Sequence, residues 1–116
     1  MSKDQKQPEI IEKYYTYLKW ITQRVAKFPR NQRYTLGEKI EETAFEVLKN
    51  LIEAYYSKEK IGILRKANLN LEILRFFIRL AKDLALLSNK QYEFSATSLV
   101  EIGQQIGGWI KQQLNK

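Results

Sequence analysis

Apolar residues recur along this chain at steps of three and four, the spacing that places side chains on one face of an α-helix. The first series consists of Ile11, Tyr14, Leu18, Ile21, Val25 and Phe28. Pro8 suits the opening turn of this helix, because proline lacks an N–H group that the first turn leaves unpaired. The helix should end near Lys27, since the residue before Pro29 is disfavoured in the α conformation.

A second helix is predicted after a polar connector at residues 30–33. Thr35 and Glu38 have the spacing of a capping box, in which each side chain bonds the other residue's backbone N–H. The helix should therefore open at Thr35 and run to about Tyr56. Its apolar positions are Leu36, Ile40, Ala44, Val47, Leu51 and Ala54.

The third predicted helix follows a turn at Ser57 and Lys58, and it is the longest and most apolar. Its main series is Leu64, Ala67, Leu71, Leu74, Ile78, Ala81, Ala85 and Ser88. A second series beside it is Ile73, Phe77, Leu80, Leu84 and Leu87. Two adjacent series form a face too wide for one partner, so this helix should contact at least two others. Residues 88–91 should end it.

The fourth helix is predicted to begin at Ser95 or at Ser98, the latter with Glu101 in a second capping-box pattern. Its inward positions are Leu99, Ile102, Ile106, Trp109 and Gln113. Four helices with short connectors, and no strand-like alternation, predict an all-α, antiparallel up-down-up-down four-helix bundle. Residues 8–116 should form this single domain, after a polar N-terminal tail at residues 1–7.

The chain of 116 residues contains neither cysteine nor histidine. These absences exclude disulfides, thiol nucleophiles and cysteine-ligated zinc, and they remove the commonest general base and transition-metal ligand. Carboxylate chemistry remains open in principle at Glu38, Glu41, Glu42, Glu46 and Glu53. A helix surface rich in glutamate is normally just solubilising, so we expect no catalytic residue, no metal and no cofactor.

Lysine and arginine number 20 against 13 acidic residues, a net charge of +7. Such an excess indicates a polyanionic partner, namely nucleic acid, an anionic membrane or an acidic protein. The polar N-terminus lacks the apolar core of a signal peptide, and no stretch approaches the ~20 apolar residues of a membrane span. We expect a cytoplasmic protein that does not bind membranes, because the core already claims every apolar face.

Two groups of cations are candidate binding residues. The first comprises Arg24, Lys27, Arg30 and Arg33, at the end of the first helix and in the connector after it. The helix dipole favours cations at Arg24 and Lys27 but does not account for the two connector arginines. The second lies along one face of the third helix and comprises Arg65, Asn68, Glu72, Arg75, Arg79 and Lys82. Aligned like charges weaken a helix slightly, so local stability does not require them. A phosphate-binding rail and a merely solvated face both fit this pattern.

Tyr15, Tyr17 and Trp20 lie outside the main apolar series of the first helix. Base stacking could use such rings, but burial in a subunit interface is the favoured interpretation. The glycine-rich segment 103–108 falls within the fourth helical pattern and follows no strand, so it is not a phosphate loop. Glycines that weaken a helix predict close approach of another backbone, within the bundle or across an interface.

Three segments of the sequence, residues 27–40, 67–88 and 101–111, resemble the accessory variability determinant proteins of diversity-generating retroelements. They begin with Lys-Phe-Pro-Arg-Asn-Gln-Arg, Ala-Asn-Leu-Asn-Leu-Glu and Glu-Ile-Gly-Gln-Gln-Ile-Gly-Gly-Trp. The related proteins encoded in ribosomal RNA intervening sequences are a weaker match. They commonly carry Asn-Ile-x-Glu-Gly where this chain reads Asn-Leu-Ile-Glu-Ala at residues 50–54.

The resemblance implies a four-helix bundle that assembles into a homopentameric barrel without catalytic residues. It also implies binding to the element's reverse transcriptase and to RNA or cDNA during mutagenic retrohoming. Matching cations are Lys27, Arg30, Arg33, Arg75, Arg79 and Lys82, whereas Arg24 and Arg65 come from the charge pattern alone. The competing hypothesis is a helical homo-oligomeric scaffold that holds a partner protein and uses its charge only for solubility.

Overall fold

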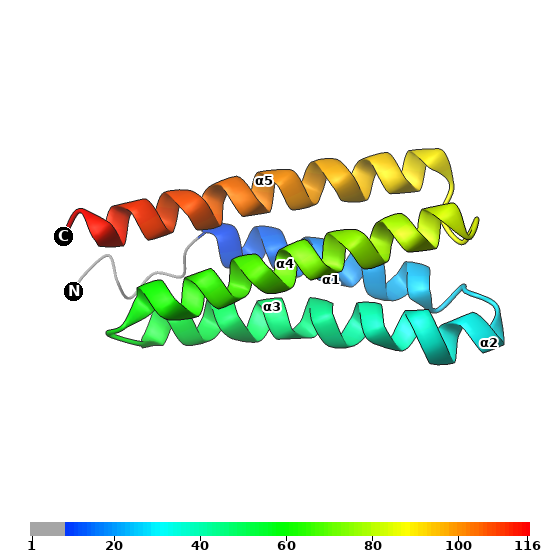
Figure 1. Ribbon diagram of the computed structural model, residues 1–116, viewed down its shortest axis with the longest axis horizontal. Helices are drawn as coiled ribbons and strands as arrows, with labels where there is room; N and C mark the ends of the chain where they lie inside the picture. The colour runs from blue at the N-terminus through cyan, green and yellow to red at the C-terminus, as the bar shows by residue number, and fades with distance from the viewer. Residues whose placement is uncertain (1–8) are drawn as a thin grey trace.

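The structure, a computed structural model, describes residues 9–116 and consists of helices and connectors over that range. Its four long helices are α1 (Glu9–Val25), α3 (Glu38–Tyr56), α4 (Lys60–Asp83) and α5 (Asn89–Leu114). They lie antiparallel to their sequence neighbours in an elongated bundle (Figure 1), which confirms the predicted four-helix architecture. The predicted tail at residues 1–7 lies outside the described residues.

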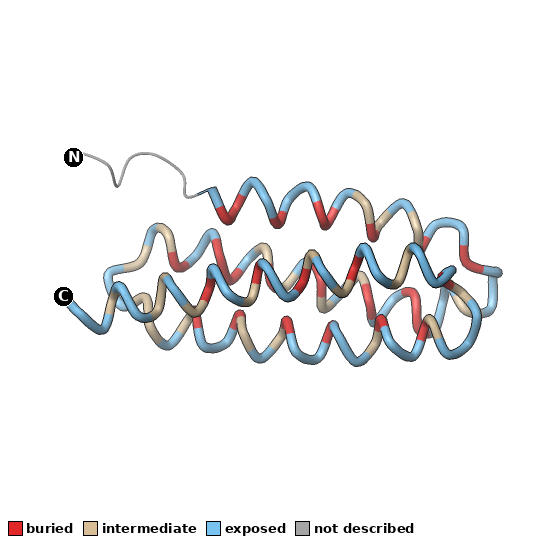
Figure 2. Tube along the Cα trace, turned by 90° about the horizontal axis from the view of Figure 1, so that it is seen from above, coloured by how far each residue is buried: buried red, intermediate tan, exposed pale blue. Residues whose placement is uncertain are grey.

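The core is a continuous seam of buried side chains along the axis of the bundle (Figure 2). Every predicted apolar position of the first two helices is buried, from Ile11 to Phe28 and from Leu36 to Ala54. The prediction that the third helix contacts two others is confirmed, because α4 packs against both α3 and α5. Three of its apolar side chains, Leu69, Ile73 and Leu80, are nevertheless exposed beside the charged residues of its outer surface.

The predicted start of the second helix at Thr35 is wrong. A short helix, α2 (Arg30–Gln32), begins directly after Pro29 and continues through a π-helical turn, η2 (Arg33–Gly37), into α3. Thr35 therefore lies inside a helical segment, where its hydroxyl donates to the Asn31 carbonyl oxygen at 2.9 Å and caps no N–H group. A threonine hydroxyl can donate as well as accept, so its spacing alone does not locate a helix end.

The predicted boundary between the third and fourth helices is also wrong. Helix α4 ends at Asp83, where Ala85 adopts a left-handed φ of 62°. The Leu86 N–H bonds the Ala81 carbonyl at 2.8 Å and the Ala85 N–H bonds the Lys82 carbonyl at 2.9 Å, the two bonds of a Schellman motif. Ala85 is therefore exposed and does not belong to the core series.

Helix α5 begins at Asn89, well before the predicted serines, because Ser88 forms its capping box. The Ser88 hydroxyl accepts from the Gln91 N–H at 3.1 Å, and the Gln91 side chain accepts from the Ser88 N–H at 2.9 Å. Ser88 is thus an exposed cap and no core residue of the preceding helix. Ser95 is fully buried within α5.

The second apolar series predicted for the third helix does not form one seam. Leu80 and Leu84 are exposed, Ile73 is at the edge of exposure, and Phe77 is half-buried. Leu87 is buried, but from the turn after the helix. The reason is geometric: α4 has neighbours on two sides only, so positions pointing away from both reach the surface.

The aromatic cluster of α1 packs mainly within the subunit. Tyr17 is only 2% exposed, and its hydroxyl shares a 2.7 Å hydrogen bond with Ser95 of α5. Trp20 is half-buried, with its ring 4.7 Å from the ring of Phe94. The interface predicted for these rings is therefore wrong for Tyr17, which holds α1 against α5. For half-buried Trp20 and for Tyr15, which is 52% exposed, it stays a prediction.

The glycines of α5 differ in their surroundings. A Cβ atom at Gly103 would lie 3.4 Å from the Leu71 side chain, which agrees with the predicted close packing. At Gly107 and Gly108 it would meet nothing within 4 Å. The predicted close approach is therefore absent for these two glycines within the described subunit.

Candidate functional site

Six of the eight predicted cations lie toward one end of the bundle. This connector end carries the α1–α3 connection (residues 26–37) and the α4–α5 turn (residues 84–88), which lie side by side at the right of Figure 1. The six residues are Arg24, Lys27, Arg30, Arg33, Arg79 and Lys82. Arg75 lies near the middle of α4, and Arg65 lies 17 residues before Lys82, roughly 25 Å away along the helix.

Net charge alone does not mark the connector end, because Lys66, Lys111 and Lys116 lie toward the other end. Lys60, also at that end, is used structurally, since its amine donates to the carbonyl oxygens of Ala54, Tyr55 and Ser57 at 2.6–3.0 Å. What distinguishes the cations at the connector end is their arrangement around aromatic rings.

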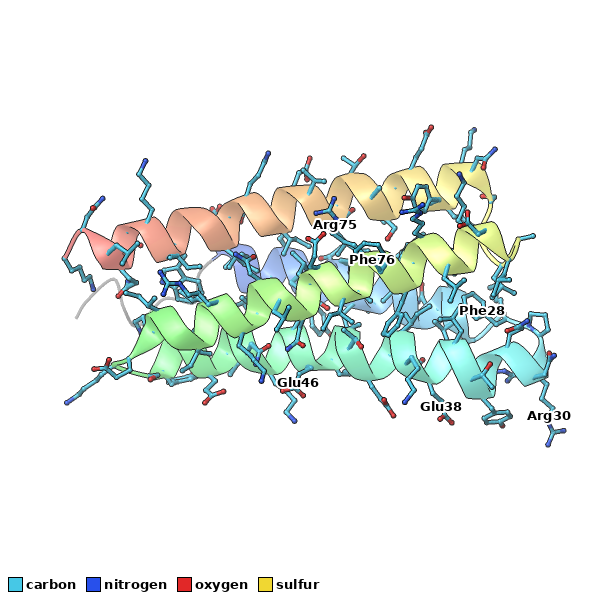
Figure 3. The ribbon with its side chains drawn as sticks, in the orientation of Figure 1. Phe28, Arg30, Glu38, Glu46, Arg75 and Phe76 are labelled. Carbon is cyan, nitrogen blue, oxygen red and sulfur yellow. The ribbon has the colours of Figure 1, made fainter. Side chains whose placement is uncertain are left out.

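The first such arrangement surrounds Tyr34, which is 58% exposed. The guanidinium carbons of Arg30 and Arg33 lie 5.9 and 5.8 Å from the centre of its ring, close enough for cation–π attraction. Figure 3 shows Arg30 projecting from the extreme end of the bundle. The turn of helix after Pro29 thus places two exposed arginines and one exposed ring on the same short segment.

Arg24 differs from its neighbours in the first group. It is half-buried, and its Nε atom is buried without a hydrogen-bond partner among residues 9–116. Lys27 is exposed and lies two residues after the end of α1, whereas the sequence predicts it at the end of that helix. Arg24 is therefore less available to a ligand than Lys27, Arg30 or Arg33.

The second arrangement lies along α4. The Arg75 guanidinium contacts the Glu72 carboxylate at 3.2 Å, so its charge is partly neutralised within its own helix. The Lys82 amine lies 5.1 Å from the centre of the Tyr92 ring, which comes from α5. Arg79 is exposed and forms no ion pair in the part of the chain that the structure describes. The aligned charge of this face thus rests on Arg79 and Lys82.

Two depressions between α4 and α5 accompany these cations and share Glu72 and Arg75 as lining residues. The larger has a volume of about 520 Å³ and is lined by Asn68, Glu72, Arg75, Leu99, Gly103 and Gln104, among others. The smaller has a volume of about 200 Å³ and is lined by Glu72, Arg75, Phe76, Arg79 and Tyr92. Arg75 and Phe76 lie between the two ribbons in the view of Figure 3. Arg75 and Arg79 of α4 therefore border a concave surface with an aromatic wall.

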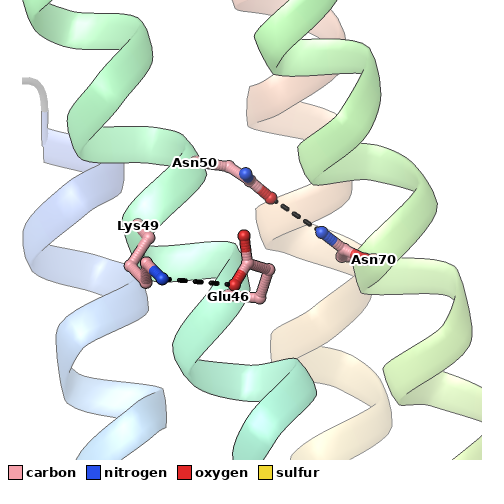
Figure 4. Close-up of polar contacts among 4 residues, drawn as sticks. All are labelled: Glu46, Lys49, Asn50 and Asn70. Carbon is pink, nitrogen blue, oxygen red and sulfur yellow. Dashed lines mark hydrogen bonds and ion pairs between the residues drawn. The ribbon is translucent and has the colours of Figure 1, made fainter.

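Two glutamates of α3 form ion pairs with lysines on their own helix. Glu46 contacts Lys49 at 3.6 Å (Figure 4), and Glu42 contacts Lys39 at 3.9 Å. Partial burial, with a smaller contribution from nearby Glu38, raises the pKa of the Glu41 carboxyl above its usual value. Residues 9–116 contain no group of three acidic, histidine or cysteine side chains placed to hold a metal ion.

A buried amide pair links α3 to α4 beside these glutamates. The Asn70 side-chain amide donates to the Asn50 side-chain oxygen at 2.8 Å (Figure 4). Asn50 is buried, so this bond satisfies a polar group that would otherwise be costly to place in the core. Asn50 therefore belongs to the packing of the bundle and is no part of the candidate site.

Sequence reasoning assigned no role at the site to Tyr34, Phe76, Tyr92 or Lys90. Arg75 and Phe76 are adjacent in the sequence, as are Arg33 and Tyr34, and this juxtaposition was an available signal. The sequence predicts a turn at Lys90, but this residue lies in the first turn of α5 at the connector end. The Lys82–Tyr92 contact joins two helices and had no local signal.

Comparison with known proteins agrees with the fold and with the quoted sequence segments. The profile of the bAvd-like family matches residues 9–113, nearly the whole chain. A comparison with curated proteins gave no match. Between residues 9 and 116, no helix has the length and apolar character needed to cross a bilayer. The match over all four long helices shows that the chain belongs to the bAvd-like family, the accessory variability determinant proteins.

Proposed function

We propose that this protein is a non-catalytic accessory factor of a diversity-generating retroelement. It binds the element's reverse transcriptase and RNA or cDNA, and so supports mutagenic retrohoming in the cytoplasm. Membership of an accessory family supports this role. The observation that carries the nucleic-acid part is a set of three cations at the connector end, Arg30, Arg33 and Lys82, which lie against the rings of exposed Tyr34 and half-buried Tyr92 and form no ion pair within residues 9–116.

The physical argument is release of counterions from the nucleic-acid backbone. Besides the half-buried Arg24, the predicted cations at the connector end number five, and none of them forms an ion pair within residues 9–116: Lys27, Arg30, Arg33, Arg79 and Lys82. If each contacts one phosphate of a single strand, the logarithm of the binding constant falls with the logarithm of salt concentration with a slope of about −3.5. A protein whose charge serves only solubility has a slope near zero.

The test is RNA affinity measured against salt concentration for the full chain and two charge-matched variants. Arg79→Gln/Lys82→Gln should weaken binding and reduce the slope by about 1.4, because two phosphate contacts are lost. Lys39→Gln/Lys49→Gln removes the same net charge from α3, where both lysines pair with glutamates. This control should leave the slope unchanged. Equal effects of the two variants would contradict a localised binding surface.

The reverse transcriptase is the second proposed partner. Co-purification of the enzyme with this chain, repeated after nuclease treatment, separates direct contact from bridging by RNA. Retention after nuclease is expected. Loss of the enzyme after nuclease would contradict direct binding.

Exposed apolar side chains favour a second candidate, a homo-oligomeric scaffold that has no direct contact with nucleic acid. They include Tyr15 on α1, and Phe45 and Ile52 on α3. Faces of this kind commonly mark protein contacts. We propose that copies of the chain associate through them into the homopentamer typical of the family. Light scattering should give a mass of five chains, and a monomer would contradict the assembly.

A further inference from the structure

Phe76 is the most exposed phenylalanine in the described part of the chain, at 61%. It lies on α4 directly after Arg75 and one turn before Arg79, on the opposite side from the core residues Leu74 and Ile78. It contributes little to the packing of the bundle. Its exposed ring is a wall of the 200 Å³ depression that Arg75 and Arg79 also line.

Contacts with Glu72 and Tyr92 determine how much positive charge lies beside the Phe76 ring. Glu72 holds the Arg75 guanidinium at 3.2 Å, which makes that pair nearly neutral and reduces the repulsion that a bare carboxylate would exert on a phosphate. Tyr92 holds the Lys82 amine 5.1 Å from its ring centre. The net positive charge beside Phe76 is therefore carried by Arg79 and Lys82, one turn apart along α4.

We propose that this depression binds single-stranded nucleic acid, with one base stacked on Phe76 and the adjoining phosphates on Arg79 and Lys82. Base faces in a duplex are covered by neighbouring base pairs, whereas an unpaired base has a free face that an aromatic side chain can cover. Ring, cations and concavity coincide here, which is the combination that single-strand-binding surfaces use. The proposal rests on the nucleic-acid binding proposed above and adds the strandedness and the stacking residue.

The experiment compares three probes of equal length: a mixed-sequence single strand, its duplex, and an abasic strand that keeps every phosphate. The full chain, Phe76→Leu and a control, Tyr56→Leu, are titrated with each. Leucine is apolar and a better helix former than phenylalanine, and Phe76 is exposed, so folding should be preserved. Tyr56 is 76% exposed and lies at the end of α3, at the opposite end of the bundle from the connector. Tyr56→Leu therefore also removes one exposed aromatic ring, but away from the proposed site.

Phe76→Leu should weaken binding of the single strand roughly 5- to 150-fold, the range for loss of one stacked base. Binding of the abasic strand and the salt slope should not change, because the cations remain. Tyr56→Leu should behave as the full chain does. The full chain should also bind the single strand more tightly than the duplex.

Three results would overturn the proposal. If Phe76→Leu binds the single strand as tightly as the full chain does, Phe76 does not stack on a base. In that case a salt slope equal to that of the full chain would still support nucleic-acid binding by the cations. An equal loss for the abasic strand shows that the ring acts without a base. A changed mass or loss of reverse transcriptase, with nucleic-acid binding intact, makes Phe76 a protein-contact residue. If the full chain binds none of the probes, both this proposal and the nucleic-acid part of the proposed function fail.

Discussion

The hydrogen bond between Tyr17 and Ser95 is the main buried polar contact between α1 and α5. The two single substitutions that remove it, Ser95→Ala and Tyr17→Phe, should lower the stability of the fold by different amounts. The two hydroxyl oxygens are 2.7 Å apart, and both residues are almost completely buried. Ser95→Ala leaves the buried Tyr17 hydroxyl without a hydrogen-bond partner. Tyr17→Phe removes the partner of the Ser95 hydroxyl, but this hydroxyl can rotate and donate to the backbone carbonyl four residues earlier in α5.

The expected magnitudes follow from this difference. A buried hydroxyl left without a partner costs ~1–3 kcal/mol of stability. We expect Ser95→Ala to lie near ~2 kcal/mol and Tyr17→Phe near ~1 kcal/mol, because only the serine has an alternative acceptor. The double variant leaves no stranded group, so it should cost less than the sum of the singles by about 1 kcal/mol.

Urea unfolding followed by far-ultraviolet circular dichroism measures all four members of this cycle. At a typical urea dependence for a small domain, ~2 kcal/mol shifts the midpoint by roughly 1 M. Each titration is repeated at several protein concentrations, because self-association adds to apparent stability. Additive effects of the two substitutions would refute the reasoning, since they would show that the hydroxyls do not depend on one another.

Three further predictions concern single positions and pH. Gly37→Ala should destabilise the fold by about 1–2 kcal/mol in chemical unfolding, because its Cβ would lie 2.9 Å from the Val25 side chain; an unchanged midpoint would contradict the close approach. Ala85→Gly should stabilise the fold by about 1 kcal/mol and raise the melting temperature, since it relieves a left-handed φ of 62°; a decrease would show that this backbone is not strained. Burial raises the pKa of both Tyr14 and Tyr17 above the ordinary tyrosine value of 10.0, so their contribution to stability should be complete below that pH and decline above it. Unfolding free energies at about pH 8 and pH 11 test this, and the decline should be smaller in Tyr17→Phe.

Hydrophobic spacing predicted the interior of each long helix but not the helix ends. The buried series from Ile40 to Ala54 and from Leu64 to Ala81 were readable because burial repeats with the helical period. At the ends, one or two hydrogen bonds decide the outcome. The Thr35 hydroxyl could accept from an N–H group as a helix cap or donate to the carbonyl four residues earlier, and it donates. Ser88 could end one helix or cap the next, and it caps α5.

The candidate site was predictable only in part. Arg79 and Lys82 were readable as aligned cations because their spacing fixes a common helix face. The pairing of Glu72 with Arg75 was readable as well, because residues three apart lie on the same face of a helix. The sequence does not reveal that Arg24 is half-buried, since this depends on which side of α1 the neighbouring helices cover.

The sequence by itself determined that this chain forms four amphipathic helices, lacks cysteine and histidine, and carries a net charge of +7. Those properties depend on residue type and spacing, which folding does not alter. The tertiary structure decided which faces remain open and which side chains meet across helices. Tyr17 became a core residue because α5 supplies Ser95 opposite it, and Lys82 met Tyr92 because a Schellman turn at Ala85 folds α5 back along α4. Contacts between distant segments depend on helix rotation and on the position of each turn, which a single-chain pattern of apolar residues leaves unspecified.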